Sequence, residues 1–181
     1  MRACGVPRHP IRLAVTLVAA GALLTACTTL PGRGGTPMLT ATPQATWTAP
    51  AGIDLTDPDQ YAAALEDGVN AARVQIGLDP LEHEPCLEPV AVERAAALVG
   101  APELTHAPLP PVRDECPGGL VAENLSRSVD PPQTVVQAWI DSPTHLENLA
   151  SGELRRGAIG CVADGGTTTR PRLVCSHVFL D

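Results

Sequence analysis

Six cysteines are the side chains whose chemistry is easiest to assign in this chain of 181 residues. Two of them, Cys4 and Cys27, lie near the N-terminus. The other four are spread through the rest of the chain: Cys86, Cys116, Cys161 and Cys175. No two cysteines have Cys-x-x-Cys spacing, which argues against the alternative of a four-cysteine zinc site. In an exported protein, an even number of cysteines is typical of disulfides, so the four predict two bridges.

The first 26 residues have the layout of a secretory signal peptide. Positive charges at Arg2, Arg8 and Arg12 precede an apolar stretch over 13–24, and small residues follow it. A transmembrane helix needs about 20 apolar residues, so this stretch is short for one. The basic segment has no Arg-Arg pair, which favours the general export route over the twin-arginine route.

The sequence Leu24-Thr25-Ala26-Cys27 resembles the lipobox of bacterial lipoprotein signal peptides. That resemblance implies cleavage before Cys27, a diacylglycerol on its sulfur and often a further acyl chain, such as palmitate, on the new amino terminus. Each buried methylene contributes about 0.8 kcal/mol, so two or more acyl chains give stable membrane attachment. The alternative is an ordinary cleaved signal with an incidental cysteine. We expect the protein on the extracytoplasmic face of the cell membrane.

The chain beyond the predicted signal is strongly acidic. All 20 acidic residues follow Cys27, three of the 12 basic residues precede it, and there is no lysine, which leaves a net charge of −11. This balance argues against binding to nucleic acid, or to anionic lipid by charge alone. Residues 28–52 are rich in Thr, Pro, Gly and Ala and predict an extended stem. The expected organisation is a lipoprotein signal peptide (1–26), a lipidated cysteine and stem (27–55) and one domain (56–181).

Helical periodicity comes first in the domain, and strand patterns come last. Three helices are predicted: from Asp57-Pro58 to Gly77, from Glu88 or Pro89 to Val99, and from Asp130-Pro131 onward. Residues 107–119 predict a proline-rich loop, and 120–129 are ambiguous. Segments 158–163 and 173–180 predict a β-hairpin. Helices followed by paired strands indicate an α+β domain.

The predicted hairpin also favours one pairing of the cysteines. A turn near Gly165–Arg170 would place Cys161 beside Cys175, which leaves Cys86 for Cys116.

No motif for acyl or phosphoryl transfer is apparent. A hydrolase needs an activated nucleophile or an activated water molecule. Ser142 precedes His145 by three residues across a proline, and Ser126 and Ser128 follow Glu123, but none of these serines lies in a Gly-x-Ser-x-Gly elbow. The sequence therefore gives hydrolysis no independent support.

Three stretches, in order, resemble one family. They are Asn70–Arg73 followed by Gly77–Leu81, then His106 with Ala122–Leu125, and then Val135–His145 with Asn148-Leu149. Together they are similar to the CAP superfamily, also called SCP-like, which includes cysteine-rich secretory proteins, insect antigens and plant pathogenesis-related proteins. The match is closest to the short bacterial branch and covers Tyr61 to Leu180.

The resemblance implies a three-layer α-β-α sandwich with a central antiparallel sheet, and a cleft with two histidines and one or two glutamates. His106 and His145 match the two histidines, and Glu123 matches the glutamate of the family's Gly-Glu-Asn motif. Ser142 stands where a second glutamate often lies, and Ala122 replaces the usual glycine.

Two roles for these three cleft residues stay open. Two imidazoles and a carboxylate could hold zinc or another divalent ion, or they could hydrogen-bond one another in a structural network. The leading hypothesis is a non-catalytic binding or interaction module for a lipid, a glycan or an envelope protein, an apolar ligand being reasonable by analogy with lipid-binding family members. The alternatives are a metal-dependent hydrolase and a structural envelope protein. Of the other histidines, His83 is predicted to be solvated, and strand alternation would turn His177 toward either the cleft or water.

Overall fold

The structure is a computed structural model, which describes residue 44 and residues 46–181. The predicted signal peptide, Cys27 and most of the predicted stem lie outside the described residues. Within the described part of the chain, no helix is both long enough and apolar enough to span a membrane. One described residue of the predicted stem, Trp47, lies against Gly68 of α1. This end of the stem segment therefore packs on the domain.

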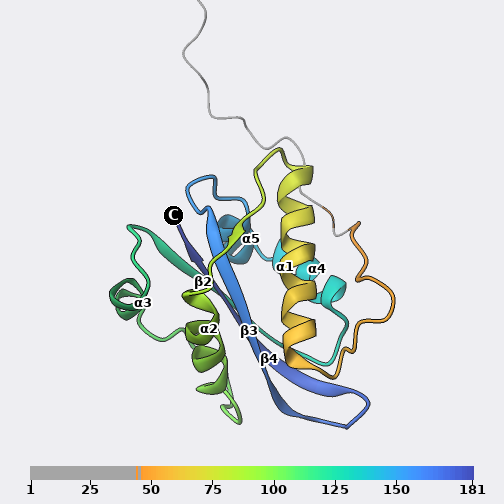
Figure 1. Cartoon of the computed structure of the whole chain (residues 1–181). Helices are drawn as coiled ribbons and strands as arrows, with labels where there is room; N and C mark the ends of the chain where they lie inside the picture. Colours follow the sequence, from red (N-terminus) through yellow and green to blue (C-terminus); the bar gives the residue numbers. More distant parts are fainter. Residues whose placement is uncertain (1–43, 45) are drawn as a thin grey trace, which may run out of the picture. The chain divides into compact units, whose positions relative to one another are not determined.

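Five helices and four strands make up the described domain (Figure 1). The helices are α1 (Pro58–Gln75), α2 (Leu87–Ala96), α3 (Pro110–Glu115), α4 (Pro132–Asp141) and α5 (Pro143–Leu149). The strands are β1 (Glu82–His83), β2 (Val121–Ser128), β3 (Arg156–Gly166) and β4 (Pro171–Leu180). They form one sheet in the order β1-β3-β4-β2.

The sheet is mixed, which corrects one part of the prediction. Strands β2, β3 and β4 are antiparallel as expected, but β1 pairs with β3 in parallel. Two residues make too short a run to show any periodicity, and a parallel pair needs a long crossover connection that local patterns do not reveal. The ambiguous segment 120–129 contains β2.

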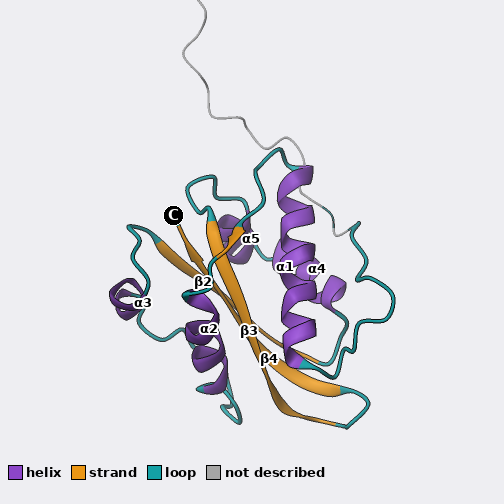
Figure 2. Cartoon of the chain, viewed as in Figure 1, coloured by secondary structure: helices purple, strands orange, loops and turns teal. Residues whose placement is uncertain are grey.

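Alternating side chains of the sheet divide the core into two layers. Ile159 and Phe179 belong to a cluster with α1 and α4, whereas Ala158 and Val178 belong to a cluster with α2 and α3. Because successive strand residues point to opposite faces, each strand serves both layers. The predicted three-layer α-β-α arrangement is confirmed (Figure 2).

Helix α2 approaches the sheet closely at Gly160 on β3. A Cβ atom at this position would overlap the backbone of Ala91 and Val92, so only glycine allows this contact. Just beyond its C-terminal end, the segment that follows α2 is held by Arg127 of β2, which donates to the carbonyl oxygens of Leu98 and Ala101. Helix α2 and the segment after it are therefore both fixed against the sheet.

The predicted ends of the long helices agree with the structure within a few residues. Helix α1 follows Asp57, whose carboxylate accepts from two backbone N–H groups of the first turn, and Gly77 beyond it has φ +79°. Helix α2 begins at Leu87 and ends at Ala96, before Val99.

Two short helices were not predicted. The prediction of a loop over residues 107–119 is wrong for α3, where prolines at the start of the segment favour the first turn of a helix. The sequence pattern does not reveal this helix, because Val112 is its one buried residue. Helix α5 directly follows α4, and Ser142 is the one residue between them. Helices of one or two turns contain too few apolar positions to show a period of 3.6 residues.

Both predicted disulfides are present. Cys161 and Cys175 face each other in the register of β3 and β4 and form one bridge. Cys86, just before α2, is bonded to Cys116, just after α3. The second bridge ties together the two helices of one layer.

Arg73 connects α1 to two distant segments of the chain. Its side chain is almost completely buried and donates to four backbone carbonyl oxygens at 2.9–3.0 Å, those of Asp79, Leu149, Ser151 and Leu154. A buried cation needs such partners, because desolvation of the unpaired charge is costly. One side chain therefore holds the turn after α1 and the connection from α5 to β3.

We expect Arg73→Met to lower the free energy of unfolding by about 3 kcal/mol, since four carbonyl groups lose their charged donor, those of Leu149 and Leu154 in buried contacts. Urea denaturation followed by circular dichroism measures this. The matched control is Arg155→Met, because Arg155 is exposed and should change stability by less than about 0.5 kcal/mol. Equal effects of the two substitutions would contradict the assigned role.

Candidate functional site

The candidate site is centred on Glu123 in the edge strand β2. Its side chain points to the layer of α2 and α3, and only 1% of that side chain is exposed. A buried carboxylate is unfavourable without hydrogen-bond donors or a counter-charge. The contacts of this one group therefore decide what the site can do.

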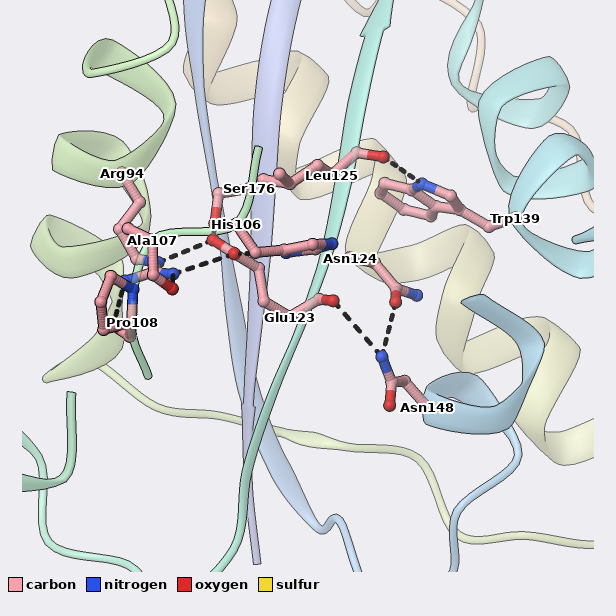
Figure 3. A network of polar contacts seen from close by, with 10 residues as sticks. All are labelled: Arg94, His106, Ala107, Pro108, Glu123, Asn124, Leu125, Trp139, Asn148 and Ser176. Atoms are coloured by element: carbon pink, nitrogen blue, oxygen red, sulfur yellow. Dashed lines mark hydrogen bonds and ion pairs between the residues drawn. The ribbon is translucent and has the colours of Figure 1, made fainter. Parts of the chain in front are cut away.

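Arg94 of α2 provides the counter-charge (Figure 3). Its Nε lies 2.7 Å from Glu123 Oε1, and its Nη2 lies 2.9 Å from Oε2. This is a bidentate pair, the strongest geometry for a guanidinium and a carboxylate. The same guanidinium donates to the carbonyl oxygens of Ala107 at 2.9 Å and Pro108 at 3.3 Å. Arg94 thus joins α2, β2 and the segment that precedes α3.

Ser176 and His106 complete the shell around the carboxylate. Ser176 of β4 donates from Oγ to Glu123 Oε1 at 2.7 Å, because strand alternation turns it to the same face of the sheet as Val178. His106 Nδ1 lies 2.8 Å from Glu123 Oε2, and 52% of the His106 side chain is exposed. The carboxylate therefore meets one cation, one hydroxyl and one imidazole.

These donors keep Glu123 ionised. Burial alone would raise the pKa of Glu123, but hydrogen bonds from Arg94, Ser176 and His106 outweigh it and hold the pKa below the ordinary value of 4.5. A lowered carboxyl pKa stabilises the fold above the unfolded-state pKa, and the contribution is lost as pH falls through the folded-state pKa. This network therefore contributes fully at neutral pH and weakens below about pH 4.5.

A second set of polar contacts joins β2 to α4 and α5. Asn148 of α5 donates to the Glu123 carbonyl oxygen at 3.3 Å and to Asn124 Oδ1 at 2.8 Å. Asn124, which is completely buried, donates to the His145 carbonyl oxygen at 3.1 Å. Trp139 donates from its indole N–H to the Leu125 carbonyl oxygen at 3.0 Å. These contacts attach α4 and α5 to the edge strand (Figure 3).

The structure places one predicted cleft residue, His106, in direct contact with Glu123, and the third, His145, close enough to His106 for their charges to interact. His106 contacts Glu123, whereas the contact that holds His145 uses its backbone. The His145 side chain lines a separate groove between β2 and α4, with Leu125 and Trp139. Burial and the nearby His106 lower the pKa of His145 below its ordinary value.

The donor set does not fit a divalent metal ion. Among the described residues, no group of three or more His, Cys, Asp or Glu side chains is placed to share an ion. A carboxylate has about four lone-pair sites, and Glu123 uses them for Arg94, Ser176 and His106. A metal ion would also meet the Arg94 guanidinium at this position, and like charges repel at short distance.

His83 and His177 lie outside this network. His83 is half exposed and lies 3.0 Å from Glu66, in line with its predicted solvation. His177 points neither to the network nor to water. It is buried on the α1 face of the sheet, where its ring packs 3.7 Å from that of Phe179. Burial lowers the pKa of His177 to about 3, so it stays neutral at physiological pH.

Arg94 and Ser176 were not predicted from the sequence. Arg94 belongs to a Glu-Arg pair on a helix whose orientation the sequence leaves open. Ser176 could have been placed from the alternation of β4, but only once Val178 was known to face α2. Neither residue carries a motif, so the network emerges only from the packing of α2 on the sheet.

Comparisons with known proteins agree with this fold. The family model described as the cysteine-rich secretory protein family, CAP, matches residues 66–179. No curated protein matches the chain.

Three solved structures are similar to the chain. A cysteine-rich secretory protein from Staphylococcus aureus is 19% identical, with TM-score 0.59, over 70% of this chain and 40% of its own. An outer surface protein from Borrelia burgdorferi is 25% identical, with TM-score 0.56, over 69% and 95%. An extracellular protein with an SCP domain from Bacillus anthracis is 17% identical, with TM-score 0.56, over 68% and 43%.

The family match extends over more than half of the chain, from α1 to β4. The matched region spans about two fifths of the Staphylococcus and Bacillus chains, and nearly all of the Borrelia chain. On the family match and the shared fold, the chain belongs to the cysteine-rich secretory protein (CAP) family.

Proposed function

We propose that this protein is a non-catalytic binding module on the extracytoplasmic face of the cell membrane, tethered through a lipid on Cys27. The similar solved structures are described as secretory, outer-surface or extracellular proteins, which supports the location. The lipobox-like sequence before Cys27 supports the tether. The partner chemistry is a lipid, a glycan or an envelope protein.

The state of Glu123 carries the non-catalytic part of this proposal. A general base or a metal ligand needs a free lone pair near its substrate or ion. Both carboxylate oxygens of Glu123 accept from Arg94, and each accepts one further hydrogen bond. The two carboxylate oxygens of Glu123 therefore hold α2 and β4 to the edge strand β2.

A double-mutant cycle tests this structural task. Arg94→Met and Glu123→Leu should each lower the free energy of unfolding by about 2–3 kcal/mol, because each leaves a buried charge without its partner. The double variant should lose only about 1–2 kcal/mol, since no charge remains. Ser176 is the buried group that lacks its acceptor, whereas His106 and the carbonyl groups of Ala107 and Pro108 belong to exposed residues, which water can reach. Urea denaturation measures all three.

The control for this cycle is the exposed ion pair between Arg170 and Asp130, at 3.3 Å. Its coupling energy should be below about 1 kcal/mol. Additive losses at Arg94 and Glu123 would show that the pair is not a structural unit.

Zinc titration separates this function from the hydrolase alternative. We expect no one-to-one zinc binding to metal-stripped protein, and a melting temperature unchanged by zinc or chelator, because Arg94 occupies the cation position. A specific site at 100 times its dissociation constant would add about 2.7 kcal/mol of stability, which a melting curve resolves. Stoichiometric binding that is lost in His106→Ala would overturn the non-catalytic assignment.

Membrane attachment is tested at Cys27. Cys27→Ser should move the protein from the membrane fraction to the soluble fraction, because it removes the sulfur that would carry the lipid. Cys4→Ser is the matched control, since Cys4 lies in the predicted signal peptide and should not affect retention. Fractionation followed by immunoblotting measures both. Retention of the Cys27 variant in the membrane fraction would refute the tether.

A further inference from the structure

A groove between α2 and α3 lies beside the Arg94–Glu123 pair, and we call it the α2–α3 groove. Its volume is about 300 Å³, at the lower end of the usual range for small-molecule pockets. An apolar cavity of about 150 Å³ holds benzene, and this groove has about twice that volume, which suits fused or linked rings. Most of its lining is apolar, including Val90, Ala97, Leu98, Pro108, Pro111 and Val112.

Two fixed links hold the walls of the groove. At one end, the Cys86–Cys116 disulfide joins the start of α2 to the end of α3. At the other, Arg94 of α2 donates to the carbonyl oxygens of Ala107 and Pro108, just before α3. Walls held in place before binding reduce the ordering cost of association. The groove is therefore preorganised.

The charges around the groove select against anions. Its charged lining residues are one arginine and three glutamates. Arg94 and Glu123 neutralise each other, which leaves Glu93 and Glu115, both exposed. A ligand with a carboxylate, sulfonate or phosphate would meet two uncompensated negative charges. An uncharged apolar ligand avoids this repulsion.

We propose that the α2–α3 groove binds a small, uncharged apolar molecule of about two to three rings. This inference rests on the proposed binding function and names the ligand class and its site. The volume, apolar lining and acidic surroundings of the groove all favour this occupant over an anionic amphiphile such as a fatty acid.

A matched pair of fluorescent probes tests the proposal. N-phenyl-1-naphthylamine and 1-anilinonaphthalene-8-sulfonate share the same rings and differ by one sulfonate. The protein is the full mature chain with Cys27→Ser, since acyl chains and detergent would bind the probes themselves. At about 0.15 M salt, where exposed charges still interact within about 8 Å, the uncharged probe should bind at one site at least tenfold more tightly than the sulfonate.

Substitutions in the groove locate the binding. Ala97→Trp should weaken binding of the uncharged probe at least tenfold, because the exposed Ala97 lines the groove and an indole would fill it. Val74→Trp, at an exposed position of α1 outside the groove, should change it less than twofold. Ala107→Trp serves if Ala97→Trp does not fold, because Ala107 also lines the groove.

Removal of the acidic charges tests selectivity. Glu93→Gln with Glu115→Gln should raise sulfonate affinity at least fivefold and leave the uncharged probe within twofold. The control is Glu147→Gln with Glu153→Gln, since both residues are exposed and lie outside the groove. It should change the affinity of neither probe.

Three outcomes would overturn the proposal: no saturable binding of the uncharged probe, equal binding of both probes, or binding unaffected by the tryptophan in the groove. Dimerisation in analytical ultracentrifugation that Ala97→Trp abolishes would also overturn it, by assigning the groove to a second copy. All of these are independent of zinc binding at His106 and Glu123. Failure of this inference is therefore distinguishable from failure of the proposed function.

Discussion

A buried carboxylate on an edge strand is the constraint on which the site depends. Glu123 is shielded from water, and moving an isolated carboxylate into such surroundings would cost several kcal/mol. The fold meets that cost with Arg94, and this fixes where α2 lies relative to β2. Ser176 and His106 fill the remaining acceptor sites. One charge pair thereby sets the arrangement of α2, two strands and the segment before α3.

The same pair supports the proposed structural use of the cleft residues over metal binding. A guanidinium is a permanent cation, and here it occupies the position where a metal ion would need to approach Glu123. The two functions expected of the cleft residues, metal binding and structural hydrogen bonding, compete for the same lone pairs. In the described residues the structural use accounts for all of them.

The two layers of the domain are stabilised by different means. On the α1 face, Arg73 satisfies four carbonyl oxygens, and one disulfide crosses the hairpin of β3 and β4. On the α2 face, the second disulfide and Arg94 link α2 to α3 and its preceding segment. The α2 layer has the smaller apolar cluster, so these links matter most there, and they leave an open but preorganised groove.

Local patterns in the sequence determined α1, α2, α4, the β3–β4 hairpin and both disulfides, because caps, periodicity and turn residues act over a few positions. The family resemblance supplied His106 and Glu123. The short α3, α5 and β1 lacked enough residues for a pattern. Only the tertiary structure decided that Arg94 neutralises Glu123, and that the backbone carbonyl of His145 accepts a hydrogen bond from Asn124 of β2. Those contacts join segments far apart in the chain, so they depend on how α2 and α5 pack on the sheet.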